Sequence, residues 1–414
     1  TGTRRASGAV VLVLLLPSVC CVGAGVSRVL FHYSDELDGA FMRAFLPQAG
    51  GTRLDRDVQL GSVVQTKLEG RSAVALRILS KDAPGYMRGS IYDRYQGRSW
   101  VDTLQSRLTW PIAQDKDVSS EQRFRLRPLS SVSAFHDGLK SREVWPNRSI
   151  GDMVFTQLNT PFLDINVSEI LVSGHGAATV EQVVSGSGYT LHIDEEEGRA
   201  SPLSEELESA LLDVPRGLDE EVRTLALNLF DGDTTTSEKV RRVVAYFDEN
   251  YAYNLGIEIP ADVNPITYFL LERPPGHCEL FASSAVMLLR LGGVPCRYVT
   301  GYVAVERNSV GEYWVARSRD AHAWVEAWDD DAGWVTVEAT PAAGVPSGES
   351  ASRFSYVWDE VKFQFQQFKD AIRAGDFIGA LRLFVRRAAR AVGDWGVMAG
   401  LSLLGLAMVI YVVR

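Results

Sequence analysis

Three residues in the second half of the chain have the side chains that nucleophilic catalysis needs: Cys278, His322 and Glu338. Cysteine is a good nucleophile only as a thiolate, so it needs a base that can also carry positive charge. The base in turn needs an acceptor that fixes its tautomer, and a carboxylate serves for this. The order cysteine, histidine, carboxylate within one segment predicts acyl transfer through a thioester.

The sequence around Cys278 predicts that this residue lies on the first turn of a helix. Pro274-Pro275-Gly276 cannot continue a preceding helix, apolar residues recur at helical spacing from Cys278 to Leu291, and Gly292-Gly293 ends the run. A first turn favours an anion, so it lowers the pKa of a thiol and offers an N–H group to a developing oxyanion. The alternative is that Cys278 is only a small buried thiol.

His322 lies between two strand-like runs, 313–316 and 323–328, and a turn at 329–333 leads to a further strand at 334–338. Adjacent antiparallel strands would place His322 beside Glu338, whose carboxylate would orient the ring. The residues alone leave three alternatives open. In the first, His322 is a surface residue at a strand end. In the second, Glu338 is a solvated carboxylate, and in the third, Asp320 is the group that orients His322.

The segments before Cys278 divide into a β-rich part and a helical part. From about residue 60 to 193, short alternating runs such as 73–78 and 188–193 are separated by turn residues, which predicts an all-β module. Helical periodicity follows at 204–212 and 218–229. Thr235 and Glu238 form a capping box that opens a helix running to about Asn250.

The segment from about Leu203 to Pro341 resembles the transglutaminase-like core of bacterial membrane proteins. The matching motifs are ordered and dense, at residues 276–282, 290–297, 301–302, 322–326 and 333–341. The resemblance implies a papain-like α+β fold in which a helix carrying the cysteine packs on an antiparallel sheet, with Cys278, His322 and an acidic third residue as catalytic residues. The family usually has Asp in the third place, where this chain has Glu338.

Two tyrosines upstream of the cysteine, Tyr251 and Tyr253, match an aromatic pair that such domains often carry. Either residue lines the acyl site or packs in the core. The resemblance further implies a protein or peptide substrate with an amide, such as the side chain of Gln, and membrane or ATPase companion proteins.

Composition narrows the classes of partner and cofactor. The net charge of −10 argues against nucleic acid as the main partner. Two of the four cysteines, Cys20 and Cys21, lie in an apolar run, so there is no disulfide framework and Cys278 is expected to be a free thiol. We identify no cofactor motif or metal cluster, since the acidic run 329–331 is too short for a calcium site.

Two apolar stretches, 8–25 and 395–413, have close to the length of a membrane span. Arginines between residues 382 and 390 alternate with apolar residues at helical spacing, which predicts an amphipathic helix before the second stretch. With the resemblance, these stretches predict a protein of the bacterial inner membrane whose catalytic domain is extracytoplasmic.

The predicted organisation has five parts. These are a transmembrane segment (1–27), a β-rich extracytoplasmic module (28–200), a transglutaminase-like catalytic core (201–345), a linker with an amphipathic helix (346–394) and a second transmembrane segment (395–414). The predicted function is that of a membrane-anchored cysteine acyltransferase or hydrolase acting on amide bonds. The alternative is a catalytically silent, membrane-tethered binding or assembly protein that uses the same fold.

Overall fold

The computed structural model describes residues 57–70, 72–112, 122–126, 138–147, 152–180, 188–194, 202–232, 235–257, 259–348 and 351–373 (side chains to 367). The chain divides into two compact units, Thr1–Gly50 and Gly51–Arg414, and every described residue belongs to the second. Both predicted membrane segments and the predicted amphipathic helix around 378–390 lie outside the described residues. Within the described ranges, none of the helices combines the length and the hydropathy that a membrane crossing requires.

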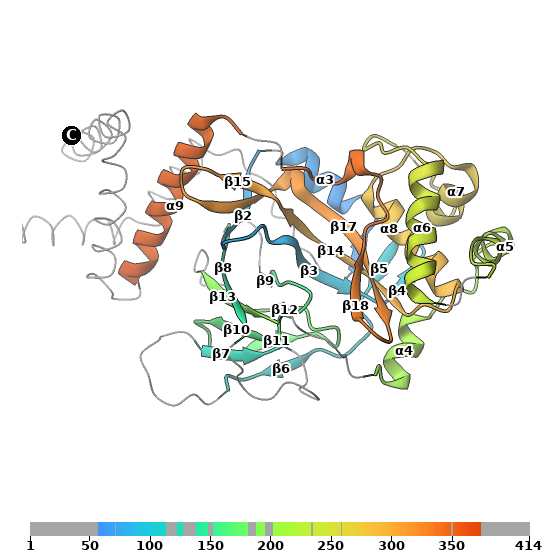
Figure 1. Cartoon of the computed structure of the whole chain (residues 1–414), viewed down its shortest axis with the longest axis horizontal. Coiled ribbons are helices and arrows are strands. Elements are labelled where there is room, and N and C mark those ends of the chain that lie inside the picture. Colours follow the sequence, from blue (N-terminus) through green and yellow to red (C-terminus); the bar gives the residue numbers. More distant parts are fainter. Residues whose placement is uncertain are drawn as a thin grey trace, which may run out of the picture. The chain divides into compact units, whose positions relative to one another are not determined.

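A four-stranded antiparallel sheet in the order β18-β17-β14-β3 forms the centre of the second unit (Figure 1). Its strands are β3 (Gly85–Tyr92), β14 (Cys296–Ala304), β17 (Ala321–Asp329) and β18 (Gly333–Val337). Helix α8 (Cys278–Leu291) packs on β14 and β17, and helices α5, α6 and α7 pack against α8. A helix that begins at a cysteine and lies on an antiparallel sheet is the arrangement that the sequence predicts.

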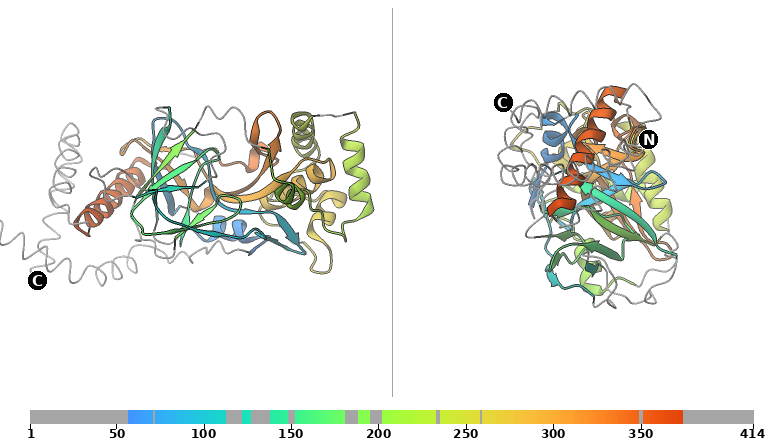
Figure 2. Two further views of the ribbon diagram at one scale, coloured as in Figure 1. Left: turned by 90° about the horizontal axis from the view of Figure 1, so that it is seen from below. Right: turned by 90° about the vertical axis from the view of Figure 1, so that its left-hand side faces the viewer.

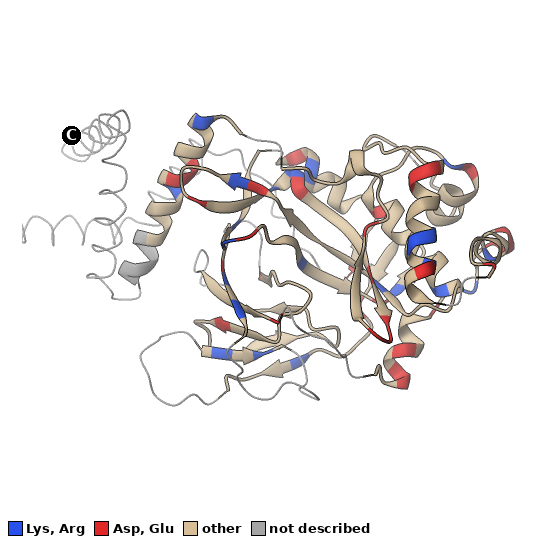
Figure 3. Cartoon of the chain, in the orientation of Figure 1, with Lys and Arg blue, Asp and Glu red and all other residues tan. Residues whose placement is uncertain are grey.

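Three helices before α8 begin close to their predicted positions: α4 (Glu205–Leu211), α5 (Glu220–Leu229) and α6 (Thr236–Asn250). The segment 256–275 was predicted as a loop, which is wrong in part, because it contains helix α7 (Pro265–Glu272), capped by the Asn264 side chain. The predicted capping box between Thr235 and Glu238 opens α6 with both of its hydrogen bonds, and Val243 and Phe247 are buried on the inner face of this helix. Acidic residues gather in the first turns of α4 and α5, where the helix dipole favours them (Figure 3).

The segment predicted as all-β contains strands, as expected, but also a helix. A seven-stranded sheet has the order β15-β16-β2-β8-β13-β10-β7, and two smaller sheets have the orders β1-β5-β4 and β6-β11-β12-β9. The bounds are β1 (Asp57–Gln59), β2 (Val74–Leu79), β4 (Arg94–Gln96), β5 (Ser99–Val101), β6 (Arg107–Thr109), β7 (Gln122–Arg125), β8 (Lys140–Pro146), β9 (Met153–Val154), β10 (Phe162–Ile165), β11 (Ile170–Val172), β12 (Ala178–Thr179), β13 (Tyr189–Ile193), β15 (Glu306–Asn308) and β16 (Tyr313–Arg317). The unpredicted helix is α3 (Ser62–Glu69).

Two sheets contain strands from both sides of the predicted boundary at residue 200. Strand β3 pairs with β14, and β2 pairs with β16. A buried hydrogen bond from the Trp100 indole to the Ser283 hydroxyl, 2.8 Å long, also joins β5 to α8. The strands before residue 200 therefore complete the sheet that carries the predicted site.

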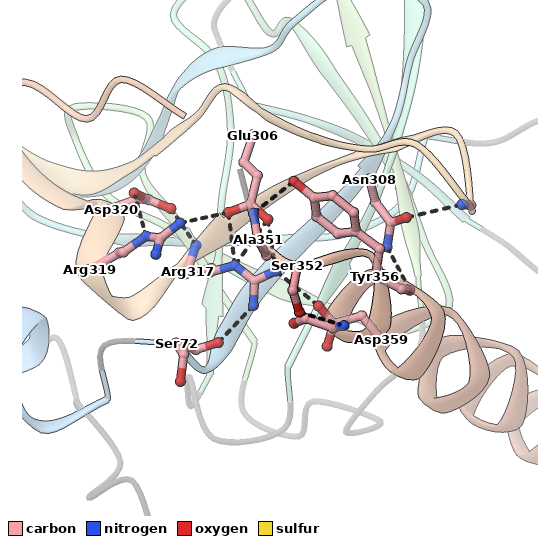
Figure 4. Close-up of polar contacts among 12 residues, drawn as sticks. Ser72, Glu306, Asn308, Arg317, Arg319, Asp320, Ala351, Ser352, Tyr356 and Asp359 are labelled. Carbon is pink, nitrogen blue, oxygen red and sulfur yellow. Dashed lines mark hydrogen bonds and ion pairs between the residues drawn. The ribbon is translucent and has the colours of Figure 1, made fainter. Parts of the chain in front are cut away.

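Helix α9 (Arg353–Arg373) lies within the segment predicted as a linker with an amphipathic helix (346–394), at the opposite end of the β-structure from α4–α8 (Figure 2). A buried polar network attaches it (Figure 4). Arg317 donates three hydrogen bonds to Glu306, of 2.7, 2.8 and 3.1 Å, and one of 3.0 Å to Asp359 of α9. The network also fixes the short 3₁₀ turn Ser318–Asp320, which leads directly into β17 and His322.

Candidate active site

Cys278 is the first residue of α8, and its side chain is fully buried. The approach to it is fixed by two backbone hydrogen bonds of Gly276, one with Ala252 (2.9 Å) and one with Asn254 (2.7 Å). A Cβ on Gly276 would lie 2.5 Å from the ring of Phe269, so only glycine fits here. The chain therefore reaches the nucleophile position along one defined path, and Cys278 stands where the N–H groups of a first helical turn have no intrahelical partner.

His322 and Glu338 lie side by side, as the strand order predicts. His322 Nε2 is 2.7 Å from Glu338 Oε2. The His322 side chain has no exposed surface, whereas that of Glu338 is 21% exposed. Because Nε2 faces Glu338, Nδ1 is the ring nitrogen available to Cys278, with which His322 also interacts.

Asp320, the alternative partner for His322, has a different role in the structure. Its carboxylate accepts a hydrogen bond of 2.8 Å from the backbone N–H of Arg317 and lies 3.8 Å from Arg319. Asp320 therefore stabilises the turn that precedes His322, and Glu338 is the carboxylate that contacts the ring.

The Glu338 carboxylate is held by two further donors. The hydroxyl of Tyr86 donates to Oε2 at 2.7 Å, and the backbone N–H of Thr340 donates to Oε1 at 2.8 Å. Tyr86 comes from β3, and its ring packs against Trp324 at a centroid separation of 5.1 Å. These contacts fix the carboxylate in the orientation that His322 needs.

A second cation lies near the thiol. Lys67 of α3 is buried, and its ammonium group donates to the Tyr253 hydroxyl at 3.3 Å. Burial opposes the charge on Lys67, but the interactions with Cys278 and Tyr253 raise its pKa above the ordinary value. Tyr253 therefore lies in the site. Tyr251, by contrast, packs among Phe rings and donates to the Leu270 carbonyl at 2.9 Å, so it belongs to the core.

Glu279 explains how α3 reaches this position. The N-cap residue of α3 is Gly61, which has no side chain to cap the helix, and the buried carboxylate of Glu279 takes over that role. It accepts from the N–H groups of Gly61 (3.0 Å) and Val64 (3.3 Å) and from the hydroxyl of Ser62 (3.3 Å). Burial raises the pKa of Glu279 to about 7 despite these donors. The residue beside Cys278 thus anchors the helix that carries Lys67.

The electrostatics favour a thiolate–imidazolium pair. Burial opposes ionisation of Cys278, but the nearby charges of Lys67 and His322 lower its pKa below the ordinary value for a thiol. Burial likewise opposes the charged ring of His322, but Glu338 and Cys278 raise its pKa to about 9. Burial also disfavours the Glu338 carboxylate, yet His322, Tyr86 and Thr340 lower its pKa. Near pH 7 the arrangement can hold an ionised nucleophile beside a proton donor.

Lys67 and Tyr86 are site residues that the sequence did not predict. Lys67 lies in a helix of eight residues without a sequence capping signal. Tyr86 lies in the segment predicted as an all-β module, where an aromatic residue is expected to pack in the core. The stretch around Tyr86 resembles the family segment that precedes the core, and this resemblance is the signal that could have identified it.

Comparison with known proteins agrees with this geometry. Residues 223–339 match the family model for the transglutaminase-like superfamily. YebA, an uncharacterized protein of Bacillus subtilis (strain 168), is 34% identical over 148 residues, which are 34% of this chain and 20% of YebA. A protein-glutamine gamma-glutamyltransferase of Pseudomonas aeruginosa is 33% identical over 131 residues, 31% of this chain and 19% of that protein. The chain thus matches about a fifth of the length of these relatives.

The fold also has a solved counterpart. The periplasmic domain of TgpA from Pseudomonas aeruginosa superposes with a TM-score of 0.54 at 21% sequence identity, covering 69% of this chain and 93% of that domain. The mixed α/β fold is therefore similar to that of this periplasmic domain over 69% of the chain, which is much more than the 223–339 match.

Proposed function

We propose that this chain, a bacterial transglutaminase-like protein, is a cysteine acyltransferase that acts on the side-chain amides of Gln in proteins or peptides. One observation carries the proposal: a buried Cys278 at a helix start interacts with a His322 whose other nitrogen is 2.7 Å from Glu338. The relative named protein-glutamine gamma-glutamyltransferase supports the choice of glutamine.

In the first half-reaction, the Cys278 thiolate attacks the carbon of the amide, and a carbon–sulfur bond forms. The N–H of Cys278 at the start of α8 stabilises the oxyanion of the tetrahedral intermediate. The carbon–nitrogen bond then breaks, and the imidazolium of His322 gives its proton to the leaving nitrogen, which departs as ammonia. A thioester on Cys278 and a neutral His322 remain.

In the second half-reaction, an acceptor attacks the thioester carbon while His322 takes the proton of the acceptor. The carbon–sulfur bond breaks and the thiolate–imidazolium pair is restored. A primary amine as acceptor gives a cross-link, whereas water gives deamidation. The same residues around Cys278 act in the reaction with either acceptor. The acceptor that attacks the thioester therefore determines whether the product is a cross-link or a deamidated side chain. Glu338, held by Tyr86, keeps the ring of His322 oriented throughout.

One observation favours the second candidate, a catalytically silent binding protein. The side chains of Cys278 and His322 have no exposed surface. A substrate carbonyl can reach the sulfur only after local movement around the site. A silent domain would keep Cys278 closed off, and the thiol would then react slowly with small alkylating reagents.

The decisive experiment incubates the protein with Gln-containing peptides and a primary amine, with Cys278→Ala as control. Mass spectrometry of the peptides and of the protein follows. Cysteine-dependent amine incorporation establishes the transferase, and deamidated or shortened peptides establish a hydrolase on the same triad. Absence of any product and of an adduct on Cys278, together with slow alkylation, would establish the silent alternative.

We further propose that the protein is anchored in the bacterial inner membrane with its catalytic domain on the extracytoplasmic side. The support comes from the apolar stretches 8–25 and 395–413. Protease added to intact spheroplasts should cleave the catalytic domain while a cytoplasmic marker survives. Recovery of the protein in the soluble fraction after lysis would refute the anchoring.

A further inference from the structure

Three buried side chains of metal-binding type meet away from the triad residues. Asp93 lies between β3 and β4, Asp102 directly follows β5, and His175 lies in the turn between β11 and β12. One donor atom of each lies within 4.8 Å of the others, and among the described residues no other group of three His, Cys, Asp or Glu side chains is so arranged. The sequence did not reveal this cluster because three separate turns contribute to it.

The separations suit a single ion. His175 Nε2 is 3.5 Å from Asp93 Oδ1 and 3.7 Å from Asp102 Oδ1. These are long for hydrogen bonds. Around a tetrahedral ion with bonds of about 2.0–2.1 Å, neighbouring donor atoms stand about 3.4 Å apart. The two separations from His175 are therefore close to those in such a site, and the two carboxylate oxygens lie within 4.8 Å of each other.

The imidazole of His175 gives an independent indication. Its side chain has no exposed surface, and neither ring nitrogen has a hydrogen-bond partner. Leaving a buried polar nitrogen unpaired costs about 1–3 kcal/mol. Since Nε2 is directed at two carboxylate oxygens, either a proton or a metal ion must lie between them.

The backbone around the cluster orients the carboxylates. The N–H of Thr103 donates to Asp93 Oδ1 at 2.7 Å, and its hydroxyl hydrogen-bonds to the other oxygen of that carboxylate. The N–H of Leu104 donates to Asp102 Oδ1 at 3.1 Å. Both N–H groups donate to the oxygens that face His175, and such hydrogen bonds to ligating carboxylates are usual in metal sites, where they fix the direction of the coordinating groups.

We propose that Asp93, Asp102 and His175 bind one divalent transition-metal cation, with Zn²⁺ as the preferred ion and a fourth position left for water. One imidazole nitrogen and two carboxylate oxygens form a set of ligands that suits Zn²⁺. Ca²⁺ and Mg²⁺ prefer ligand sets made of oxygen atoms alone, so this set is less suited to them. The ion joins the β11–β12 turn to the turns around β4 and β5. Its role is structural and does not depend on the proposed transferase activity.

The site also connects to the central sheet. The carbonyl of His175 accepts a hydrogen bond of 3.2 Å from Arg297 of β14, and Arg297 pairs with Glu326 of β17 at 2.6 Å. A bound ion would hold the β11–β12 turn, and hence this carbonyl, against the sheet. We therefore expect metal binding to raise the unfolding temperature of the catalytic core.

The test uses the whole chain with Cys278 replaced by Ser, so that the thiol cannot bind the metal, and with any polyhistidine tag removed. After treatment with a chelator, equilibrium dialysis against Zn²⁺ and elemental analysis measure the bound metal. We expect one equivalent, a rise in unfolding temperature, and visible absorption bands of a low-symmetry site when Co²⁺ replaces Zn²⁺.

His175→Gln and Asp102→Asn should each weaken Zn²⁺ binding by about 100-fold or more, since loss of a ligand exceeds the 10–100-fold effect of its supporting partners. Asp102, at 12% side-chain exposure, is the ligand whose replacement least disturbs folding. His192→Gln is the matched control, because His192 also faces a carboxylate, that of Asp164 at 2.7 Å, and should leave metal binding unchanged.

Binding of one equivalent that both ligand variants lose, and that His192→Gln retains, supports the site. The proposal is overturned if the chelated protein takes up neither Zn²⁺ nor Co²⁺. It is also overturned if folded Asp102→Asn binds Zn²⁺ as tightly as its parent.

Discussion

Replacing Glu338 by Gln keeps the size of the side chain and removes its charge. The carboxylate is the first of the groups that raise the pKa of His322 from 6.5 to about 9, against the effect of burial. That rise corresponds to roughly 3 kcal/mol in favour of the imidazolium. If Glu338 supplies about 2 kcal/mol of it, the ratio of the charged to the neutral form of His322 falls about 30-fold at a given pH.

The second effect of the substitution concerns orientation. A Gln amide can donate to Nε2 as well as accept from it, so it no longer selects one tautomer of His322. Changing the acid of a catalytic triad to its amide has cost about 10⁴-fold in a serine protease. We therefore expect Glu338→Gln to lower kcat/KM for amine incorporation by about 100- to 10,000-fold.

Alkylation of Cys278 gives a readout that does not depend on turnover. In the native protein, iodoacetamide should react well below the ordinary pKa of a thiol, since Lys67 and His322 lower the pKa of Cys278. In Glu338→Gln, His322 loses its proton at lower pH, the thiolate loses its counter-charge, and the alkylation profile moves to higher pH. Amine incorporation by the native protein should fall above about pH 9, where His322 no longer carries the proton for the leaving ammonia.

Glu338→Asp is the matched control, because it keeps the charge with one methylene less. It should retain the low-pH alkylation and lose much less activity than Glu338→Gln. If Glu338→Gln keeps kcat/KM within threefold and its alkylation profile does not move, the role of Glu338 in orienting His322 is refuted.

Three further substitutions test other parts of the structure. Lys67→Met should raise the pKa of the Cys278 thiol and slow its alkylation at low pH, since the second cation is lost. Gly301→Ala should lower both activity and stability, by about 1–3 kcal/mol for the latter, because a Cβ would collide with the Met87 carbonyl and force β3 away from β14. Arg317→Ala should lower the free energy of unfolding by about 3–5 kcal/mol in denaturant titrations, because the carboxylates of Glu306 and Asp359 lose the buried guanidinium that they share.

Each of these has a control elsewhere in the chain. Lys239→Met removes a lysine of α6 that donates to the Gly292 carbonyl at the far end of α8 (2.8 Å), and it should leave the thiol profile unchanged. Gly217→Ala adds a Cβ that meets nothing within 4 Å. Arg307→Ala removes an exposed arginine and should change stability by less than about 1 kcal/mol. Equal effects in a variant and its control would contradict the assigned role.

The sequence predicts the triad geometry well because its members lie on neighbouring elements. Local signals place Cys278 at a helix start and His322 and Glu338 on successive strands, and the short turn between those strands leaves little freedom in how they pair. The capping box at Thr235 works in the same way, since each partner lies within one helical turn. Whether these residues are catalytic stays a prediction.

The parts that escaped prediction depend on contacts between distant segments. Tyr86 and Glu338 are 252 positions apart, and only the pairing of β3 with β14 brings them together. Helix α3 is short and lacks its own cap, so its stability comes from Glu279, 215 to 218 positions away. Without a known tertiary fold, a lysine in such a segment is interpreted from the sequence as a surface residue.

The pairing of β3 with β14 also determines whether the core can exist alone. A fragment of residues 201–345 would contain Cys278, His322 and Glu338, but β14 would become an edge strand with its backbone N–H and C=O groups unpaired along one side. Every residue of β14 is buried in the complete fold, so that new edge would be long and apolar. Such an edge pairs with strands from other chains, so an isolated core would tend to aggregate. Transfer of this core into another protein would therefore require a strand that replaces β3.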